Sequence, residues 1–362
     1  MLALLRRLFR RNRPSVPGQA TNASLGDALT SPPAVAASSA PDVSDIRVVG
    51  TAAAVPNVGA TNASVIRYDA EAAWARCLDE AHALLQSLPE ACESPDAAQL
   101  LRLLASGPET VIRQLPAAAR DALTICDDPS LPRAQLARKL EQDPALLQAL
   151  LRTANSAAMS SGRGTILSID QALDRIGMAG ARAVVLASCV DGLLSQPGGE
   201  YNAMAADVWA HMVRTAPLAR ALAPAFAADP DEAFAIALLH DVGKLVIFDR
   251  ISVLRTSRRR PVIIPSTFMH PLLQLLHEPI GALAAERWSM GERASSAIGT
   301  HHRRGHAVRR DVLAETLFAA EHADHAVRRN EPLDIDAIWR AGQLTGSPAR
   351  ASSVLQRLAA AA

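Results

Sequence analysis

The chain has few aromatic residues, few lysines and almost no net charge. Aromatic side chains make up 3% of its 362 residues, and Lys139 and Lys244 are its only lysines. The formal net charge is +1, so no bulk electrostatic field attracts nucleic acid or acidic substrates. Local basic spots such as Arg258 to Arg260 lack nearby aromatic rings on which bases could stack. We therefore expect no nucleic-acid partner.

Cysteine is scarce as well. The four cysteines are scattered without a Cys-x-x-Cys pair, at Cys77, Cys92, Cys126 and Cys189. This spacing argues against a cysteine metal site or a disulfide framework, and predicts reduced, mostly buried thiols in a reducing compartment. The sequence also has no apolar run of the ~18–20 residues that a membrane-spanning helix needs.

Alanine and leucine supply most of the 49% apolar content. Both are strong helix formers, and β-branched runs are few, so the composition predicts an all-α fold. The β-like run from Pro261 to Pro265 is expected to be a connection. Short helices with tight turns are typical of a compact multi-helix bundle. The expected helices are at Pro144–Ala154, Ile169–Gly177, Arg182–Cys189, Trp209–Leu222, Pro230–Leu239, Ile280–Trp288, Ala294–His302 and Thr316–Arg328. Asp143, Ser168 and Asp229 are expected to cap the starts of three of them.

The composition changes along the chain and indicates five segments. Residues 1–13 form a short basic amphipathic segment whose arginines interrupt the apolar residues, unlike a signal peptide. It is either a solvated chain end or a weak contact with an anionic membrane surface, so a membrane-peripheral location is one expectation. Residues 14–65, rich in Ala, Ser and Pro, predict a disordered linker. A helical leader at 66–110, the main helical domain at 111–330 and a helical tail at 331–362 follow.

Nine of the ten histidines lie between His211 and His325. The most informative pair is His240-Asp241, at the end of the apolar run Phe234 to Leu239, because it offers an imidazole and a carboxylate side by side. Taken singly, each of the other candidate residues is an ordinary helix residue. Facing helices of a bundle can nevertheless aim such groups into one pocket, where imidazole and carboxylate suit Fe, Mn or Zn. The candidates are His211, His240, Asp241, His277, His301, His302 and Asp324. We expect His82, His270, His306, His322 and His325 to be surface residues or tuning groups.

Several motifs carry a resemblance to a known family. Ala237 to Val246 resembles the signature of the HD superfamily of helical metal-dependent phosphohydrolases. The upstream motifs resemble the HDOD domain, the HD-related output domain of bacterial signalling proteins. They are Asp143-Pro-Ala-Leu146, Leu150 to Ser156 and Ile169 to Gly177, and the resemblance continues in Trp209-Ala-His211, in Gly281 to Trp288 and in His301-His302. The resemblance covers about 110–330 and leaves out 1–65. It implies an all-α fold and a bacterial, cytoplasmic, regulatory protein.

The resemblance also implies roles for the candidate residues. The HD hydrolase ligands are a His, the His-Asp doublet and a later Asp, and they correspond to His211, His240, Asp241 and Asp324. The two-metal branch that hydrolyses cyclic di-guanylate adds ligands that correspond to His277, His301 and His302. This chain has His301 to Val308 where that branch carries Gly-Tyr-Pro, which argues against the same substrate. Lys244 would contact a phosphate oxygen as a point charge.

Two functions remain open from the sequence. The first is a regulatory output module that acts through contacts with other signalling proteins and binds a divalent metal. The second is a metal-dependent HD-type phosphohydrolase that acts on a nucleotide or phosphodiester. The absence of Gly-Tyr-Pro and the HDOD-like upstream half favour the regulatory module over the enzyme.

Overall fold

Helices make up all the regular secondary structure of the described residues. The computed structural model describes residues 68–115, 120, 123–124, 133–141, 143–155, 159, 164–193, 198, 200–302, 311–329 and 331–360. The predicted basic segment 1–13 and linker 14–65 lie outside these ranges, as does His306. Within them the all-α prediction is confirmed, and Pro261 to Pro265 is a connection without a strand.

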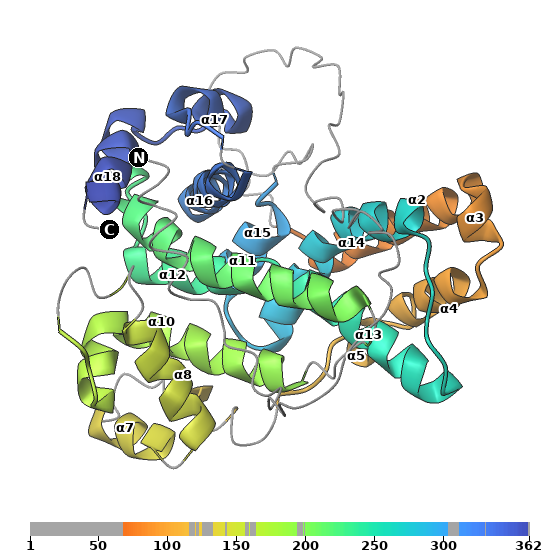
Figure 1. Ribbon diagram of the computed structural model, residues 1–362, viewed down its shortest axis with the longest axis horizontal. Coiled ribbons are helices and arrows are strands. Elements are labelled where there is room, and N and C mark those ends of the chain that lie inside the picture. Colours follow the sequence, from red (N-terminus) through yellow and green to blue (C-terminus); the bar gives the residue numbers. More distant parts are fainter. Residues whose placement is uncertain are drawn as a thin grey trace, which may run out of the picture. The chain divides into compact units, whose positions relative to one another are not determined.

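The leader begins with the helices α2 (Ala70–Ser87), α3 (Pro89–Cys92), α4 (Pro95–Leu104) and α5 (Pro108–Val111). Side-chain caps fix the starts of α2 and α4, since Asp69 accepts from the Ala72 amide and Ser94 from the Ala97 amide. The buried Asp96 accepts hydrogen bonds from Arg260 and from the Ile263 amide. These bonds attach α4 to the connection between α13 (Val242–Arg258) and α14 (Ser266–Arg287), while α2 packs along α14 (Figure 1).

The next group of helices comprises α7 (Arg133–Glu141), α8 (Pro144–Ala154) and α10 (Ile169–Leu193), and α10 packs along α12 (Pro230–Leu239). The predicted caps are present, because Asp143 accepts from the Leu146 amide and Ser168 from the Gln171 amide. Gly177 interrupts α10 with a φ of 78°, at the position where the sequence predicts a helix end. Asn155 exchanges two hydrogen bonds with the backbone of Ile166, which ties the end of α8 to the approach to α10.

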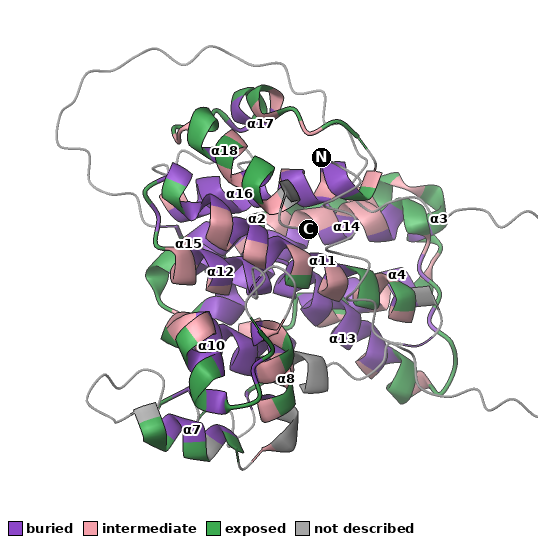
Figure 2. Ribbon diagram, turned by 60° about the vertical axis from the view of Figure 1, so that its left-hand side comes forward, coloured by how far each residue is buried: buried purple, intermediate pink, exposed green. Residues whose placement is uncertain are grey.

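Four long and two short α-helices form the centre of the fold (Figure 1). They are α11 (Glu200–Leu222), α12 (Pro230–Leu239), α13 (Val242–Arg258), α14 (Ser266–Arg287), α15 (Glu292–Gly299) and α16 (Val312–Arg329), with the 3-10 turn η1 (Ala223–Ala225) after α11. Asp229 caps α12 by accepting from the amides of Asp231 and Glu232, as the sequence predicts. Figure 2 shows buried residues concentrated on these central helices.

Two further helices, α17 (Ile335–Gly342) and α18 (Pro348–Ala360), follow the central helices. Trp339 stacks on Phe226 with ring centroids 5.2 Å apart and donates a hydrogen bond to the Gly346 carbonyl. Glu315 of α16 accepts from the amide and the hydroxyl of Thr345. These contacts attach the C-terminal helices to α16 and η1.

Several predicted helix bounds were wrong. α11 begins at Glu200 and not at Trp209, and α16 is longer than predicted at both ends. α14 begins at Ser266 and not at Ile280, because it continues through Pro271 and Pro279. α15 ends at Gly299, so His301 and His302 lie in the turn after it. Cys77 is half-buried and Cys92 is exposed, whereas the sequence predicted mostly buried thiols.

The described helices offer no membrane-spanning segment. None of them combines the length and the apolar character that a crossing requires. The prediction made from apolar run lengths is therefore confirmed for the described part of the chain.

Candidate metal centre

The His240-Asp241 doublet forms the turn between α12 and α13, and both side chains are buried. The next helix starts immediately, and Gly243 in its first turn contacts α14 closely. A Cβ atom at Gly243 would lie 2.0 Å from the carbonyl oxygen of His277, so only glycine permits this approach. The approach places His277 opposite Asp241, with 3.7 Å between Nε2 and Oδ1.

One group of donor atoms lies where α11 faces this turn. His211, His240 and Asp241 each offer a ligand atom, and these atoms lie within 4.8 Å of one another. The Nε2 atoms of His211 and His240 are 3.2 Å apart. The Nδ1 atom of His240 donates to the Ala237 carbonyl, and Nδ1 of His211 donates to a carboxylate oxygen of Asp324. In the neutral rings both Nε2 lone pairs therefore face each other, a contact that requires a proton or a cation between them.

A second group combines α14 with the turn after α15. Ligand atoms of His277, His301 and His302 lie within 4.8 Å of one another. The Nδ1 atoms of His277 and His301 donate to the carbonyls of Leu273 and Ile298, at 2.8 and 2.6 Å. Because a carbonyl only accepts, these bonds fix the tautomer and leave the lone pair on Nε2, as in histidines that bind metal.

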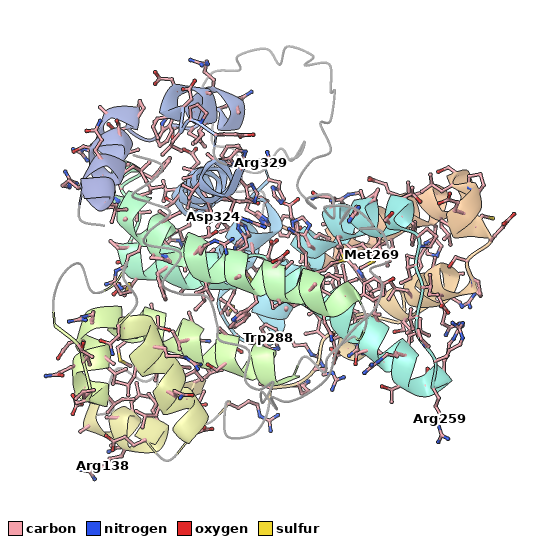
Figure 3. The ribbon with its side chains drawn as sticks, in the orientation of Figure 1. Arg138, Arg259, Met269, Trp288, Asp324 and Arg329 are labelled. Atoms are coloured by element: carbon pink, nitrogen blue, oxygen red, sulfur yellow. The ribbon has the colours of Figure 1, made fainter. Side chains whose placement is uncertain are left out.

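Asp324 lies on the side of α16 that faces α11 (Figure 3). There it contacts the ring of His211. Its Oδ2 atom accepts from Nδ1 of His211 at 2.7 Å, and Arg214 donates to both carboxylate oxygens at 2.9 and 3.1 Å. Burial alone would raise the pKa of Asp324, but the hydrogen bonds from His211 and Arg214 hold it well below its ordinary value. Asp324 therefore stays ionised and orients His211. It belongs to none of the groups of three potential metal ligands among the described residues.

Lys244 lies one turn into α13 and is 8% exposed. Its ammonium group donates to Oδ2 of Asp241 at 2.8 Å. Burial raises the pKa of Asp241, but Lys244 and then the neighbouring imidazoles outweigh burial, so this pKa lies well below its ordinary range. Lys244 neutralises Asp241, whereas the sequence suggested a contact with substrate phosphate.

The seven sequence-predicted metal ligands thus converge on one buried region, and the structure adds two residues to it. Glu321 and His325 on α16 form a group of potential ligands with His211, and Glu321 forms another with His240 and His301. His325 also stacks on His211 with ring centroids 4.9 Å apart. Glu321 precedes Asp324 by three residues and His325 by four, and positions three and four apart are neighbours on a helix. That spacing is the signal by which they could have been found.

Burial keeps three imidazoles of this region, those of His240, His301 and His325, neutral at pH 7. Burial lowers the pKa of His240 to about 4, against the opposing effect of Asp241. Burial also lowers the pKa of His301 and of His325, and neighbouring imidazoles lower both further. The neutral ring is the form that binds a metal ion.

The start of the leader packs beside this buried region. Tyr68 is buried, and its ring lies against Gly299 at the end of α15. Burial and the nearby Glu278 carboxylate both raise the pKa of the Tyr68 phenol. Glu278 in turn accepts from the His302 amide at 2.9 Å. The start of the leader is thus packed next to the turn that holds the histidine pair.

Replacing Gly299 with alanine should destabilise the fold by about 1–3 kcal/mol, the usual cost of overpacking. The added Cβ would lie 2.2 Å from the Tyr68 ring, so the start of the leader must move. The matched control is Gly164→Ala, because nothing lies within 4 Å of its Cβ position. Urea denaturation of both variants measures the difference. Equal stabilities would show that Tyr68 does not pack on α15.

A match to a family model identifies the family of this chain. The family model for the HDOD domain matches residues 112–304, more than half of the chain. The chain belongs to the HDOD family. The matched residues of this HDOD protein include six of the seven predicted ligands, and the seventh, Asp324, lies beyond them.

Individual relatives of this HDOD protein are distant. An uncharacterized protein of Treponema pallidum (strain Nichols) is 25% identical over 205 residues, which are 54% of this chain and 38% of that protein. The HDOD protein therefore spans well under half the length of this curated relative.

Solved structures confirm the fold. A Shewanella amazonensis SB2B protein to which phosphohydrolase activity is ascribed has 21% identity and a TM-score of 0.51. A second protein of that organism, to which metal-dependent phosphohydrolase activity is ascribed, has 17% identity and a TM-score of 0.53. Each comparison covers 74% of this chain and 98% of the other. At these identities the likeness establishes the fold alone.

Proposed function

We propose that this HDOD protein is a regulatory signalling module that binds divalent metal ions in the buried histidine cluster and acts through contacts with other signalling proteins. The observation that carries the proposal is the convergence of six imidazoles and a carboxylate from five helices and their turns. They are His211, His240, Asp241, His277, His301, His302 and His325.

The donor atoms suit a metal ion. Oδ1 of Asp241 and Nε2 of His301 are buried without a hydrogen-bond partner among the described residues, an arrangement that is costly unless a cation fills it. Two nitrogens bound to one Zn²⁺ at ~2.0–2.1 Å are about 3.3 Å apart at a tetrahedral angle, close to the 3.2 Å between the Nε2 atoms of His211 and His240. Mixed imidazole and carboxylate ligands favour Fe, Mn or Zn. When bound, such an ion supplies Lewis acidity.

The burial of the histidine cluster favours a regulatory role over a catalytic one. His240, Asp241, His277 and His301 are at most 1% exposed, and the Lys244 ammonium is committed to Asp241. A phosphodiester substrate has to reach the metal ions, whereas a structural or signalling ion does not. In this proposal the protein holds the ion as part of its fold, and metal binding stabilises the arrangement of α11, α14 and α16 that partners contact.

The second candidate function is a metal-dependent phosphohydrolase. It is favoured by the presence of two groups of three potential ligands side by side, His211 with His240 and Asp241, and His277 with His301 and His302. Two ions held in this way can clamp a phosphoester. A phosphohydrolase requires an opening through which substrate reaches the cluster. The best support for such an opening is the His302 side chain, which is 16% exposed.

We also propose a class of partner and a location for the protein. The protein contacts other signalling proteins in a cytoplasmic setting, and residues 1–13 add weak contact with an anionic membrane surface. Family membership supports the first statement, and the basic amphipathic pattern of residues 1–13 supports the second.

Metal analysis combined with an activity assay tests the proposal. The purified chain, reconstituted with Mn²⁺ or Zn²⁺ and desalted, should retain about two ions per molecule and show no turnover of bis(p-nitrophenyl) phosphate or cyclic di-guanylate. His270→Ala, which changes a histidine outside the cluster, should retain the same metal. Metal-dependent turnover that Asp241→Asn abolishes would establish the hydrolase instead, and a metal-free chain would contradict both readings.

A further inference from the structure

Glu321 occupies a central position among the imidazoles. It lies on α16, is 1% exposed, and precedes Asp324 by one helical turn. One of its carboxylate oxygens lies within 4.8 Å of ligand nitrogens of His240 and His301 in one group, and of His211 and His325 in another. In addition, its Oε2 atom is 3.6 Å from Nδ1 of His302.

The two carboxylates named by the HD pattern already have cationic partners. Lys244 donates to Oδ2 of Asp241, although Oδ1 of Asp241 accepts no hydrogen bond from a described residue. Both oxygens of Asp324 accept from Arg214, and one also accepts from His211. An ion that bound Asp324 would have to displace the Arg214 guanidinium from a bidentate pair, which is among the strong hydrogen-bonded contacts in proteins.

We propose that Glu321, and not Asp324, is the carboxylate that α16 contributes to the metal centre, and that it connects the two ligand groups. The inference rests on the metal-binding function proposed above. His240 belongs to the first group, His301 belongs to the second, and Glu321 forms a group of potential ligands with both. A carboxylate has two oxygens and can bind one ion with each. Asp324 then acts as a positioning residue that fixes the tautomer and orientation of His211.

The chemistry of the neighbouring rings supports this assignment. Nδ1 of His240 and of His301 each donates to a backbone carbonyl, so both rings direct an Nε2 lone pair away from the backbone. The Nε2 atom of His301 is fully buried and has no hydrogen-bond partner among the described residues. A divalent cation between this atom and Glu321 would satisfy a lone pair and a carboxylate together.

Three single variants separate the roles of the carboxylates on α16. Glu321→Gln keeps the shape of the side chain and removes its charge. Asp324→Asn keeps an oxygen that can accept from His211. Glu315→Gln is the matched control, because Glu315 is a buried carboxylate on the same helix that binds Thr345 instead of the cluster.

We expect Glu321→Gln to weaken Mn²⁺ and Zn²⁺ binding by at least about 100-fold, and Asp324→Asn by about 10-fold, which is the lower end of the range for outer-shell residues. Glu315→Gln should bind as the wild type does. Competition titration against a chelator measures the affinities, and the rise in Tm on adding metal measures them independently. Circular dichroism of the metal-free variants verifies that each is folded.

The outcomes distinguish this inference from the proposed function. Wild-type affinity in Glu321→Gln, or a larger loss in Asp324→Asn than in Glu321→Gln, would overturn the assignment of Glu321 while leaving the metal centre intact. A wild-type chain that binds neither metal would overturn the proposed function itself. The predicted order of affinities, with Glu315→Gln equal to wild type, would establish the assignment.

Discussion

Replacing Asp241 with alanine is expected to lower the free energy of unfolding by about 3–5 kcal/mol. The reason is the ion pair with Lys244, whose ammonium donates to Oδ2 of Asp241 at 2.8 Å and is almost fully buried. Removing one partner of a buried pair leaves the other charge without compensation, which is the costly case. Urea denaturation of the metal-free chain measures the effect.

The double variant Asp241→Asn with Lys244→Met separates folding from metal binding. It removes both charges together, so it should recover most of the lost stability. It should not recover metal binding, because the carboxylate that contacts His240 and His277 is gone. Lys244→Met alone should be stabilised strongly by added metal, since an ion can replace the ammonium beside Asp241. A cost below about 1 kcal/mol for Asp241→Ala would place this pair in the class of exposed ion pairs and contradict its burial.

Acid is expected to destabilise the metal-free protein between pH 6.5 and 4. The pKa of His240 falls from 6.5 to about 4 on folding because the ring is buried. In this window the unfolded chain binds a proton that the folded chain does not, so stability falls as the pH falls. The contribution of His240 is fully present above pH 6.5, is lost on approaching pH 4, and amounts to about 3 kcal/mol. Burial lowers the pKa of His301 and His325 in the same direction.

The pH dependence is checked by urea denaturation at a series of pH values from 7 to 4.5. His240→Gln removes the titrating ring and should reduce the slope of stability against pH by up to about one proton. His270→Ala, outside the cluster, should keep the wild-type slope. A stability that stays flat across this range would mean that the imidazoles of the cluster are accessible to solvent.

Local signals in the sequence predicted much of the fold. The caps at Asp143, Ser168 and Asp229 are present because each side chain accepts from an amide that has no partner within its helix. The start of α14 was not predicted, because Pro271 and Pro279 are local helix breakers. The burial of most of α14 in the centre of the fold outweighs that local preference.

The sequence named the candidate residues of the site but not the contacts between them. The family motifs identify His211, His240, Asp241 and Asp324, and spacing alone cannot show that Arg214 pairs with Asp324. Glu321 lies outside those motifs, and its importance depends on which face α16 turns toward α11, which only packing decides. The sequence therefore named candidate ligand residues, while the pairing of Asp241 with Lys244 and of Asp324 with Arg214 required the structure.

The central claim is that the clustered histidines of this HDOD protein bind metal. Anomalous X-ray scattering from crystals grown with Mn²⁺, measured on both sides of the Mn absorption edge, tests it most directly. We expect an anomalous peak within ~2.0–2.2 Å of an Asp241 oxygen and of histidine Nε2 atoms, with Glu321 among the ligands. Well-ordered crystals with no anomalous peak between Asp241 and His301 would contradict it.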